Sequence, residues 1–126
     1  PCYCGKRGCI ETWISGPAVA AYHTRATGET LTAPEIMAAA SRGEPGAVAT
    51  RARLVHRAAR SLATVINVLD PDVIVLGGGL SNTEGLATDL ERAVAPWVFS
   101  DRVTTQVVVN RHGDASGVRG AAWLWG

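Results

Sequence analysis

The stretch DPDVIVLGGGLS, residues 70–81, is the part of the chain that decides the fold. Pro71 ends any helix that precedes it, because proline lacks the amide hydrogen that a helix interior needs. Residues 72–76 then form a short apolar run rich in β-branched side chains, without alternation of polar and apolar positions. This pattern predicts a strand buried on both faces, as in a parallel sheet, and three glycines follow it at once.

Upstream of this stretch, residues 46–69 predict a long helix. Apolar side chains recur there at alternating steps of four and three, which places them on one continuous face. These positions are Val48, Ala52, Val55, Ala59, Leu62, Ile66 and Leu69. Four further positions away from that face hold arginines, and we interpret them as a solvated face rather than a binding stripe. They are Arg51, Arg53, Arg57 and Arg60.

Shorter helices are predicted before the long one. Residues 10–22 mix apolar and small side chains and predict a helix that Gly16 and Pro17 interrupt. Thr32 and Glu35 have the spacing of a capping box, which opens a short helix through residue 40.

Downstream of the glycines, Ser81 and Glu84 have the spacing of a second capping box. The helix predicted after it carries Leu86, Leu90, Val94 and Trp97 on one face. Residues 103–109 predict another strand and residues 115–125 a last helix. The order of strand, glycine turn, helix, strand and helix indicates an α/β fold with a parallel sheet. Since stable sheets usually need more than two strands, and the chain begins at Pro1 with a cysteine motif, we interpret it as a piece of a longer protein.

Composition limits the classes of function. Hydrophobic residues make up 47% and charged residues 18%, which is typical of a globular chain. The net charge of +1 lacks the basic excess of a nucleic-acid-binding protein. No apolar run approaches the roughly 20 residues that a membrane span needs.

Three cysteines within the first nine residues indicate a metal-binding loop. An odd, tightly clustered count makes a poor disulfide framework and suits a reducing compartment, so we expect a cytoplasmic protein. Zinc takes sulfur ligands in tetrahedral geometry, and Gly5 and Gly8 allow the sharp bends that such a loop needs. The candidate ligands are Cys2, Cys4 and Cys9. A disulfide from Cys4 to Cys9 with Cys2 free, or three unconnected thiols, stays open as the alternative.

Gly77, Gly78 and Gly79 are candidates for phosphate binding, because glycines let the backbone approach a ligand and a helix start offers free N–H groups. The segment is neither a Walker A loop nor the G-x-G-x-x-G fingerprint of dinucleotide-binding folds. A tight turn without any ligand is the plain alternative.

Three segments together resemble the ROK family, named for repressor, open reading frame and kinase. Residues 2–11, with the pattern Cys-x-Cys-Gly-x-x-Gly-Cys-x-Glu, resemble its zinc signature. Residues 70–81 resemble its nucleotide-side glycine segment, and residues 117–122 resemble its C-terminal helix, in the family's order. Residues 9–16 and 112–125 look most like bacterial fructokinases of this family.

The resemblance implies an actin-like, ribonuclease-H-like ATPase fold of two lobes with ATP between them. This chain would be the C-terminal portion, without the N-terminal lobe. It would comprise a zinc knuckle (1–11), a helical segment (12–69) and an α/β nucleotide-side segment (70–126). A structural zinc would be held by the three cysteines and a histidine upstream. Glu11 would bind sugar hydroxyls, although an acidic residue in a first helical turn has a purely structural explanation. The three glycines would line the nucleotide site.

The implied activity is transfer of the ATP γ-phosphoryl to a hexose hydroxyl, with magnesium on the phosphates. The catalytic aspartate base of the family would lie upstream, so no residue of this chain is expected to be catalytic and the piece alone would be inactive. Fructose is the first choice of substrate, with glucose, mannose and N-acetylated hexosamines open, and a homodimer is expected. The rival is a sugar-sensing ROK transcriptional repressor, which a helix-turn-helix upstream would identify. A stand-alone zinc-knuckle binding module is a third alternative.

Overall fold

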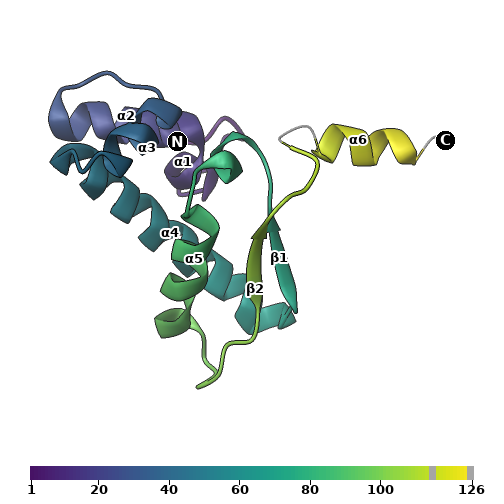
Figure 1. Ribbon diagram of the computed structural model, residues 1–126. Helices are drawn as coiled ribbons and strands as arrows, with labels where there is room; N and C mark the ends of the chain where they lie inside the picture. The colour runs from purple at the N-terminus through teal and green to yellow at the C-terminus, as the bar shows by residue number, and fades with distance from the viewer. Residues whose placement is uncertain (114–115, 125–126) are drawn as a thin grey trace.

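The computed structural model describes residues 1–113 and 116–124, and its ribbon shows most helices on one side of two strands, with the last helix projecting away on the other side (Figure 1). The helices are α1 (Glu11–Ile14), α2 (Gly16–Thr27), α3 (Ala33–Ser41), α4 (Pro45–Leu69), α5 (Leu86–Val94) and α6 (Ser116–Trp123). The strands are β1 (Val73–Leu76) and β2 (Gln106–Val109), and two short 3-10 turns are η1 (Gly79–Asn82) and η2 (Ala95–Trp97). The predicted α/β order is therefore confirmed.

The two strands pair in parallel, as the apolar run predicted. Val73 is paired with Gln106 and Leu76 with Val109. One face of the pair is covered, since Val107 is buried and Ile74 packs against the core. The prediction that the first strand is buried on both faces is wrong for this chain. Val73 and Val75 retain 45% and 60% of their exposed surface, because none of the described elements packs on their face of β1.

Helix α4 runs through the middle of the packed part of the chain. It contacts α1, α2, α3, α5 and η2. Its buried residues are Ala47, Thr50, Leu54, Ala58, Ala59, Ala63 and Ile66. The predicted helix is confirmed almost to the residue, but the predicted seam is only partly right, since Val48 and Leu69 are exposed. A helix with neighbours on several sides buries more than one stripe, and its small alanines permit close contact with those neighbours.

The helix predicted over residues 10–22 is two helices. Ser15 has extended backbone angles between α1 and α2, and Pro17 lies in the first turn of α2, where its missing N–H costs nothing. The first capping box is confirmed, because the Thr32 backbone N–H donates to Glu35 Oε2 at 2.7 Å. The hydrogen bonds from Thr32 hold the pKa of Glu35 below its usual value.

The second predicted capping box is wrong. Ser81 lies inside η1, and its hydroxyl donates to the Gly78 carbonyl at 2.7 Å instead of capping a helix. Helix α5 begins four residues later than that box implied, after Gly85, whose φ of 74° is left-handed. The predicted apolar face is confirmed for Leu86, Leu90 and Val94, the buried residues of α5, but not for Trp97, which lies in η2 and is 41% exposed.

Helix α6 projects away from the packed part of the molecule (Figure 1). Its apolar side chains Val118 and Trp123, and Leu124 directly after it, are exposed, with Trp123 at 77%. The predicted boundaries of this helix at Ala115 and Trp125, and the carboxylate of Asp114, lie outside the described residues.

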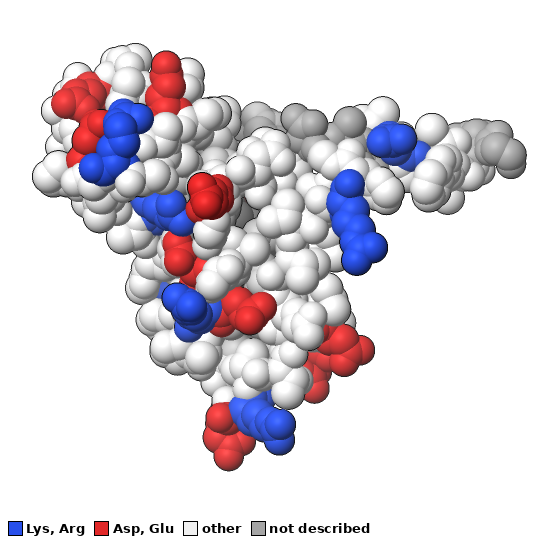
Figure 2. All heavy atoms as spheres, in the orientation of Figure 1, with Lys and Arg blue, Asp and Glu red and all other residues white. Residues whose placement is uncertain are grey.

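Surface charge is mixed rather than segregated on the face that Figure 2 shows, where basic and acidic side chains lie close together. Among the described residues, none of the helices is both long and apolar enough to cross a membrane.

The open face of β1 and the uncovered helix α6 generate a prediction for the 126-residue chain purified by itself. Exposed apolar strands and helix faces favour association with another chain. We expect light scattering over a range of concentrations to show association rather than a clean monomer. A stable monomer at every concentration would contradict this expectation.

Candidate functional site

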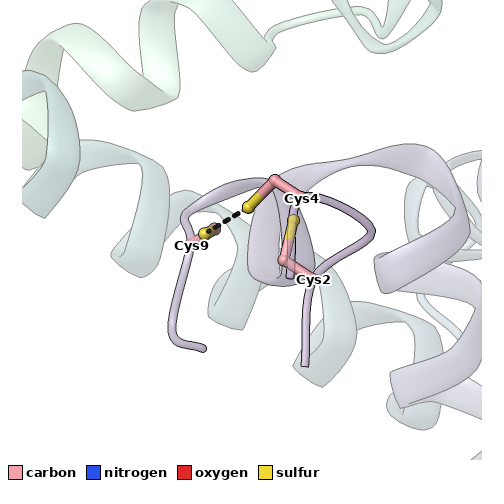
Figure 3. A group of neighbouring side chains, drawn as sticks. All are labelled: Cys2, Cys4 and Cys9. Atoms are coloured by element: carbon pink, nitrogen blue, oxygen red, sulfur yellow. Dashed lines mark hydrogen bonds between the residues drawn. The ribbon is translucent and has the colours of Figure 1, made fainter. Parts of the chain in front are cut away.

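The three cysteines converge at the start of the chain, and Figure 3 shows their side chains directed toward one another. Their sulfur atoms all lie within 4.8 Å of one another, and the Sγ atoms of Cys4 and Cys9 are 3.5 Å apart. All three are free thiols, so the alternative disulfide is not formed. The loop closes on itself through a hydrogen bond from the Cys2 amide to the Lys6 carbonyl at 2.8 Å.

This arrangement fits a tetrahedral metal with sulfur ligands. Zinc–sulfur bonds of about 2.3 Å place ligating sulfurs roughly 3.8 Å apart, within the range found here. A hydrogen bond from the Lys6 backbone, followed by those from the other thiols, lowers the pKa of Cys4 toward the thiolate form that a metal needs. The hydrogen bond with Cys4 in turn raises the pKa of Cys9.

His23, the histidine nearest to the cysteines in the sequence, does not complete this donor set. It is 1% exposed in α2, and its Nδ1 lies 2.9 Å from the Thr50 hydroxyl of α4. Its Nε2 lies 3.6 Å from a carboxylate oxygen of Glu29, so the ring belongs to the contact between α2 and α4. The described residues therefore bring together three candidate sulfur ligands, one fewer than a closed zinc site requires.

Glu11 is the first residue of α1 and is exposed. The cysteine loop leads directly into it, and the Thr12 hydroxyl donates to the Cys9 carbonyl at 2.7 Å. A helix of four residues has no stability of its own in water, so its position depends on what it packs against.

Arginines of α4 supply that support. The guanidinium of Arg57 lies 3.9 Å from the ring centroid of Trp13, and that of Arg53 lies 3.8 Å from the ring of Tyr22. Burial, with the neighbouring charge of Arg57, lowers the pKa of Arg53. These are cation–π contacts that fasten α1 and α2 onto α4.

The solvated-face interpretation of the α4 arginines holds for the exposed Arg60 but is wrong for Arg51, Arg53 and Arg57, which are half-buried. Arg51 donates to Asp89 Oδ2 of α5 at 2.8 Å, and the guanidinium of Arg60 lies 4.9 Å from the ring of Trp97. Aromatic and acidic partners from distant segments meet these arginines, which a pattern along one helix could not reveal.

The three glycines lie at the carboxyl end of β1 and form a bare turn. Gly78 has φ 77° and ψ 175°, a conformation that residues with a side chain rarely adopt. A Cβ atom built on Gly77, Gly78 or Gly79 would meet nothing within 4 Å. The turn therefore presents its backbone to open space, as a backbone that contacts a ligand must.

Glu11 and the glycine turn, the two candidate groups of the sequence, line one cavity of about 390 Å³. Its remaining wall is mostly apolar and comes mainly from α1, α4, α5, η1 and the end of β1. These residues include Leu54, Leu62, Leu76, Leu80, Leu86 and Leu90. The cysteines do not line this cavity and precede Glu11 in the sequence.

A second hollow, of about 840 Å³, lies on the other side of the turn. It runs between η1 and α3, and Gly79 and Leu80 line both hollows. The sequence did not predict that α3 lines this hollow. It indicates the capping box of α3 but not which other segments the helix contacts.

Asn110 was also missed. It follows β2 directly, and its side-chain amide donates to the Leu76 carbonyl at 3.1 Å and to the Ser81 hydroxyl at 3.2 Å. Its position after the second strand was the available signal, because the carboxyl ends of parallel strands meet at one edge of a sheet.

Comparison with known proteins gives one family for the whole chain. The ROK family profile matches residues 1–126. N-acetyl-D-glucosamine kinase of Photobacterium profundum is 41% identical over 123 residues, which are 98% of this chain and 41% of that protein. The chain thus spans about two fifths of the length of this curated relative.

Two solved structures share the fold. A ROK family glucokinase from Streptomyces griseus in complex with glucose and AMPPNP has a TM-score of 0.84 and 28% identity, over 96% of this chain and 45% of that one. A ROK family transcriptional regulator, a homolog of the E. coli MLC protein, has a TM-score of 0.70 and 28% identity, over 86% of this chain and 30% of that one.

The contact between Arg57 and Trp13 generates a prediction about α1. Replacing Arg57 with Met keeps an unbranched apolar stem but removes the charge over the ring, which is worth about 0.5–1 kcal/mol at such a site. We expect faster hydrogen exchange in residues 10–15 than in the unmodified protein. Arg60→Met, which removes the equivalent contact with Trp97, is the matched control and should leave residues 10–15 unchanged. Equal exchange in both variants would show that Arg57 does not anchor α1.

Proposed function

The chain belongs to the ROK family, and on that premise we propose that the protein containing it is an ATP-dependent hexose kinase. The γ-phosphoryl group of ATP would pass to a sugar hydroxyl, with magnesium neutralising the phosphates. One observation carries the proposal: a candidate sugar ligand, Glu11, and a candidate phosphate-binding turn line the same cavity. Two reactants held side by side in one site are what a transfer reaction requires.

The nucleotide would lie against Gly77, Gly78 and Gly79. Their backbone is unobstructed, and the hollow that continues past Gly79 toward α3 leaves room for the rest of a nucleotide. ATP and magnesium would bind here as substrate and counter-ion, while the phosphate contacts of the other lobe would come from residues upstream of this chain.

Glu11 would accept hydrogen bonds from sugar hydroxyls. Its exposure at the start of α1 and its place in the cavity wall support this role. We assign the catalytic base to none of the described residues, and Glu11 is assigned to sugar binding. A carboxylate upstream would take the hydroxyl proton, so the 126-residue piece alone should phosphorylate no sugar.

The substrate is best proposed from the relatives. Short phrases of the sequence favoured fructose, but the curated relative is an N-acetyl-D-glucosamine kinase and the solved glucokinase is described with glucose. We therefore place N-acetylglucosamine first and glucose second, with fructose behind both.

Zinc would be held by Cys2, Cys4 and Cys9 together with a histidine upstream. Its chemistry would be structural, since four protein ligands leave no open position for substrate. By closing the loop that ends at Glu11, the metal would fix the direction in which that carboxylate enters the cavity. The free thiols agree with the reducing cytoplasm as the expected location, and a homodimer remains the expected assembly.

A sugar-sensing repressor is the second candidate, favoured by the similarity of this chain to the ROK transcriptional regulator. The two candidates differ upstream, where a helix-turn-helix domain would favour the repressor. In an assay, the full-length kinase would consume ATP in the presence of hexose, whereas the repressor would bind the sugar without turnover. Absence of turnover with N-acetylglucosamine, glucose and fructose would overturn the kinase proposal.

Glu11→Gln in the full-length protein is predicted to weaken sugar binding. Gln keeps the shape but removes a charge-assisted hydrogen bond, worth roughly 1.5–3 kcal/mol, or about 10- to 150-fold in sugar kcat/KM. The KM for ATP should stay near normal. Glu44→Gln is the control, since Glu44 pairs with Arg42 at the surface and lies outside both hollows. Unchanged sugar kinetics would reduce Glu11 to a helix-start residue.

Cys4→Ser is predicted to lower both the zinc content and the melting temperature of the full-length protein, because metal binding is coupled to folding of the loop. Elemental analysis should find about one zinc per chain before the change, as a closed four-ligand site requires. Tyr3→Ala, at the neighbouring and 92% exposed position, should alter neither quantity. Freshly purified protein without zinc would exclude the metal site.

A further inference from the structure

We propose that Asn110 and Ser81 are positioning residues for the nucleotide: they hold the glycine turn in the shape that the phosphates of ATP would contact. This inference rests on the proposed function, which assigns the turn to ATP. Neither residue lies among the cysteines, Glu11 or the glycines that the sequence pointed to.

The turn needs support from outside because it has no side chains of its own. None of the three glycines would bring a Cβ atom within 4 Å of another group, so packing does not restrain them. Glycine also loses the most conformational freedom on folding, so an ordered run of three is costly. Hydrogen bonds to its backbone and to the strand that precedes it are what restrain this segment.

The bonds form a directed chain from one strand end to the other. The Asn110 side-chain amide donates to the Leu76 carbonyl, the last of β1, and to Ser81 Oγ. The Ser81 hydroxyl in turn donates a hydrogen bond to the Gly78 carbonyl at 2.7 Å. The Asn110 backbone N–H adds a bond to Leu76 at 3.0 Å. Gly78, in the middle of the turn, is thereby tied to the end of β2.

Burial makes this chain of bonds hard for water to replace. Ser81 is 3% exposed and Asn110 is half-buried. Loss of the Ser81 hydroxyl would leave an amide hydrogen of Asn110 and the Gly78 carbonyl without this partner. Asn110→Asp, which has nearly the same shape, would turn the donor into a second acceptor facing two oxygens.

The test uses the full-length protein and steady-state kinetics with ATP and the preferred hexose varied separately. Asn110→Asp and Ser81→Ala should each raise the KM for ATP about tenfold, the effect of losing one or two hydrogen bonds at the turn. The KM for sugar should stay within about twofold. Ser81→Thr, which keeps the hydroxyl, should largely preserve the KM for ATP.

Two further variants make the outcome unambiguous. Asn67→Asp is the matched control, because the Asn67 amide also donates to a backbone carbonyl, that of Trp97, but away from the turn. It should leave both KM values unchanged. Gly79→Ala meets no steric obstacle in this chain and fills the space beside the turn, so it should weaken ATP binding if the nucleotide lies there.

The possible results separate the inference from its premise. If Gly79→Ala raises the KM for ATP while both Asn110→Asp and Ser81→Ala leave it unchanged, the positioning role is overturned and the nucleotide site stands. If Gly79→Ala leaves the KM for ATP unchanged, the nucleotide does not lie at the turn. The proposed nucleotide site and the positioning role of Asn110 and Ser81 then both fail. A rise in both KM values together, with a lower melting temperature, would assign Asn110 to general stability and overturn the inference. Should Asn110→Asp fail to fold, Ser81→Ala against Ser81→Thr decides the question.

Discussion

The burial of α4 on several sides is the constraint on which the rest of the structure depends. The short helices before it and α5 after it contact this helix, and so does η2. Its buried positions are largely alanines, which bring the neighbouring backbones close and leave the larger Leu54 and Ile66 to fill the remaining space. An element as short as α1 depends on such contacts to hold its place.

The strand and glycine turn depend on α4 through α5. The buried side chains of α5 fill the space between α4 and the covered face of the sheet, where Val107 is enclosed. Glu91 of α5 also accepts a hydrogen bond from the Val107 amide at 2.9 Å. Because this backbone N–H of β2 is already paired with a carboxylate, it is not free to form a hydrogen bond with a strand of another chain. The exposed Val73 and Val75 lie on the opposite face of the sheet from the buried Val107.

Much of the fold could be predicted because its signals are local. The apolar run before the glycines identified a parallel strand, and the spacing of Thr32 and Glu35 gave a capping box that forms. The same spacing at Ser81 and Glu84 gave a wrong prediction. The Ser81 hydroxyl donates to the Gly78 carbonyl instead of accepting a hydrogen bond from a helix amide. Burial of β1 on both faces was predicted from its apolar composition. Composition indicates that a strand can be covered on both faces, but it does not show which neighbouring elements cover it.

The candidate site divides in the same way. Three thiols within nine residues must lie close together, so their cluster was legible in the sequence. The shared cavity of Glu11 and the glycines joins segments more than sixty residues apart, and only the family resemblance suggested that they meet. The contacts of Asn110 and Arg57 gave no comparable signal, because an amide or a guanidinium has many possible partners and the chosen one depends on the finished packing.

The two walls of the cavity are held by different physical means. On the Glu11 side, α1 is fastened by the Arg57–Trp13 contact and by the hydrogen bond of Thr12 to the cysteine loop. On the glycine side, hydrogen bonds between strand ends fix the turn. Between them lies a floor of leucine side chains from α4, α5 and β1. In the proposed kinase, an apolar floor beneath two polar walls would help to keep water from competing with the sugar hydroxyl.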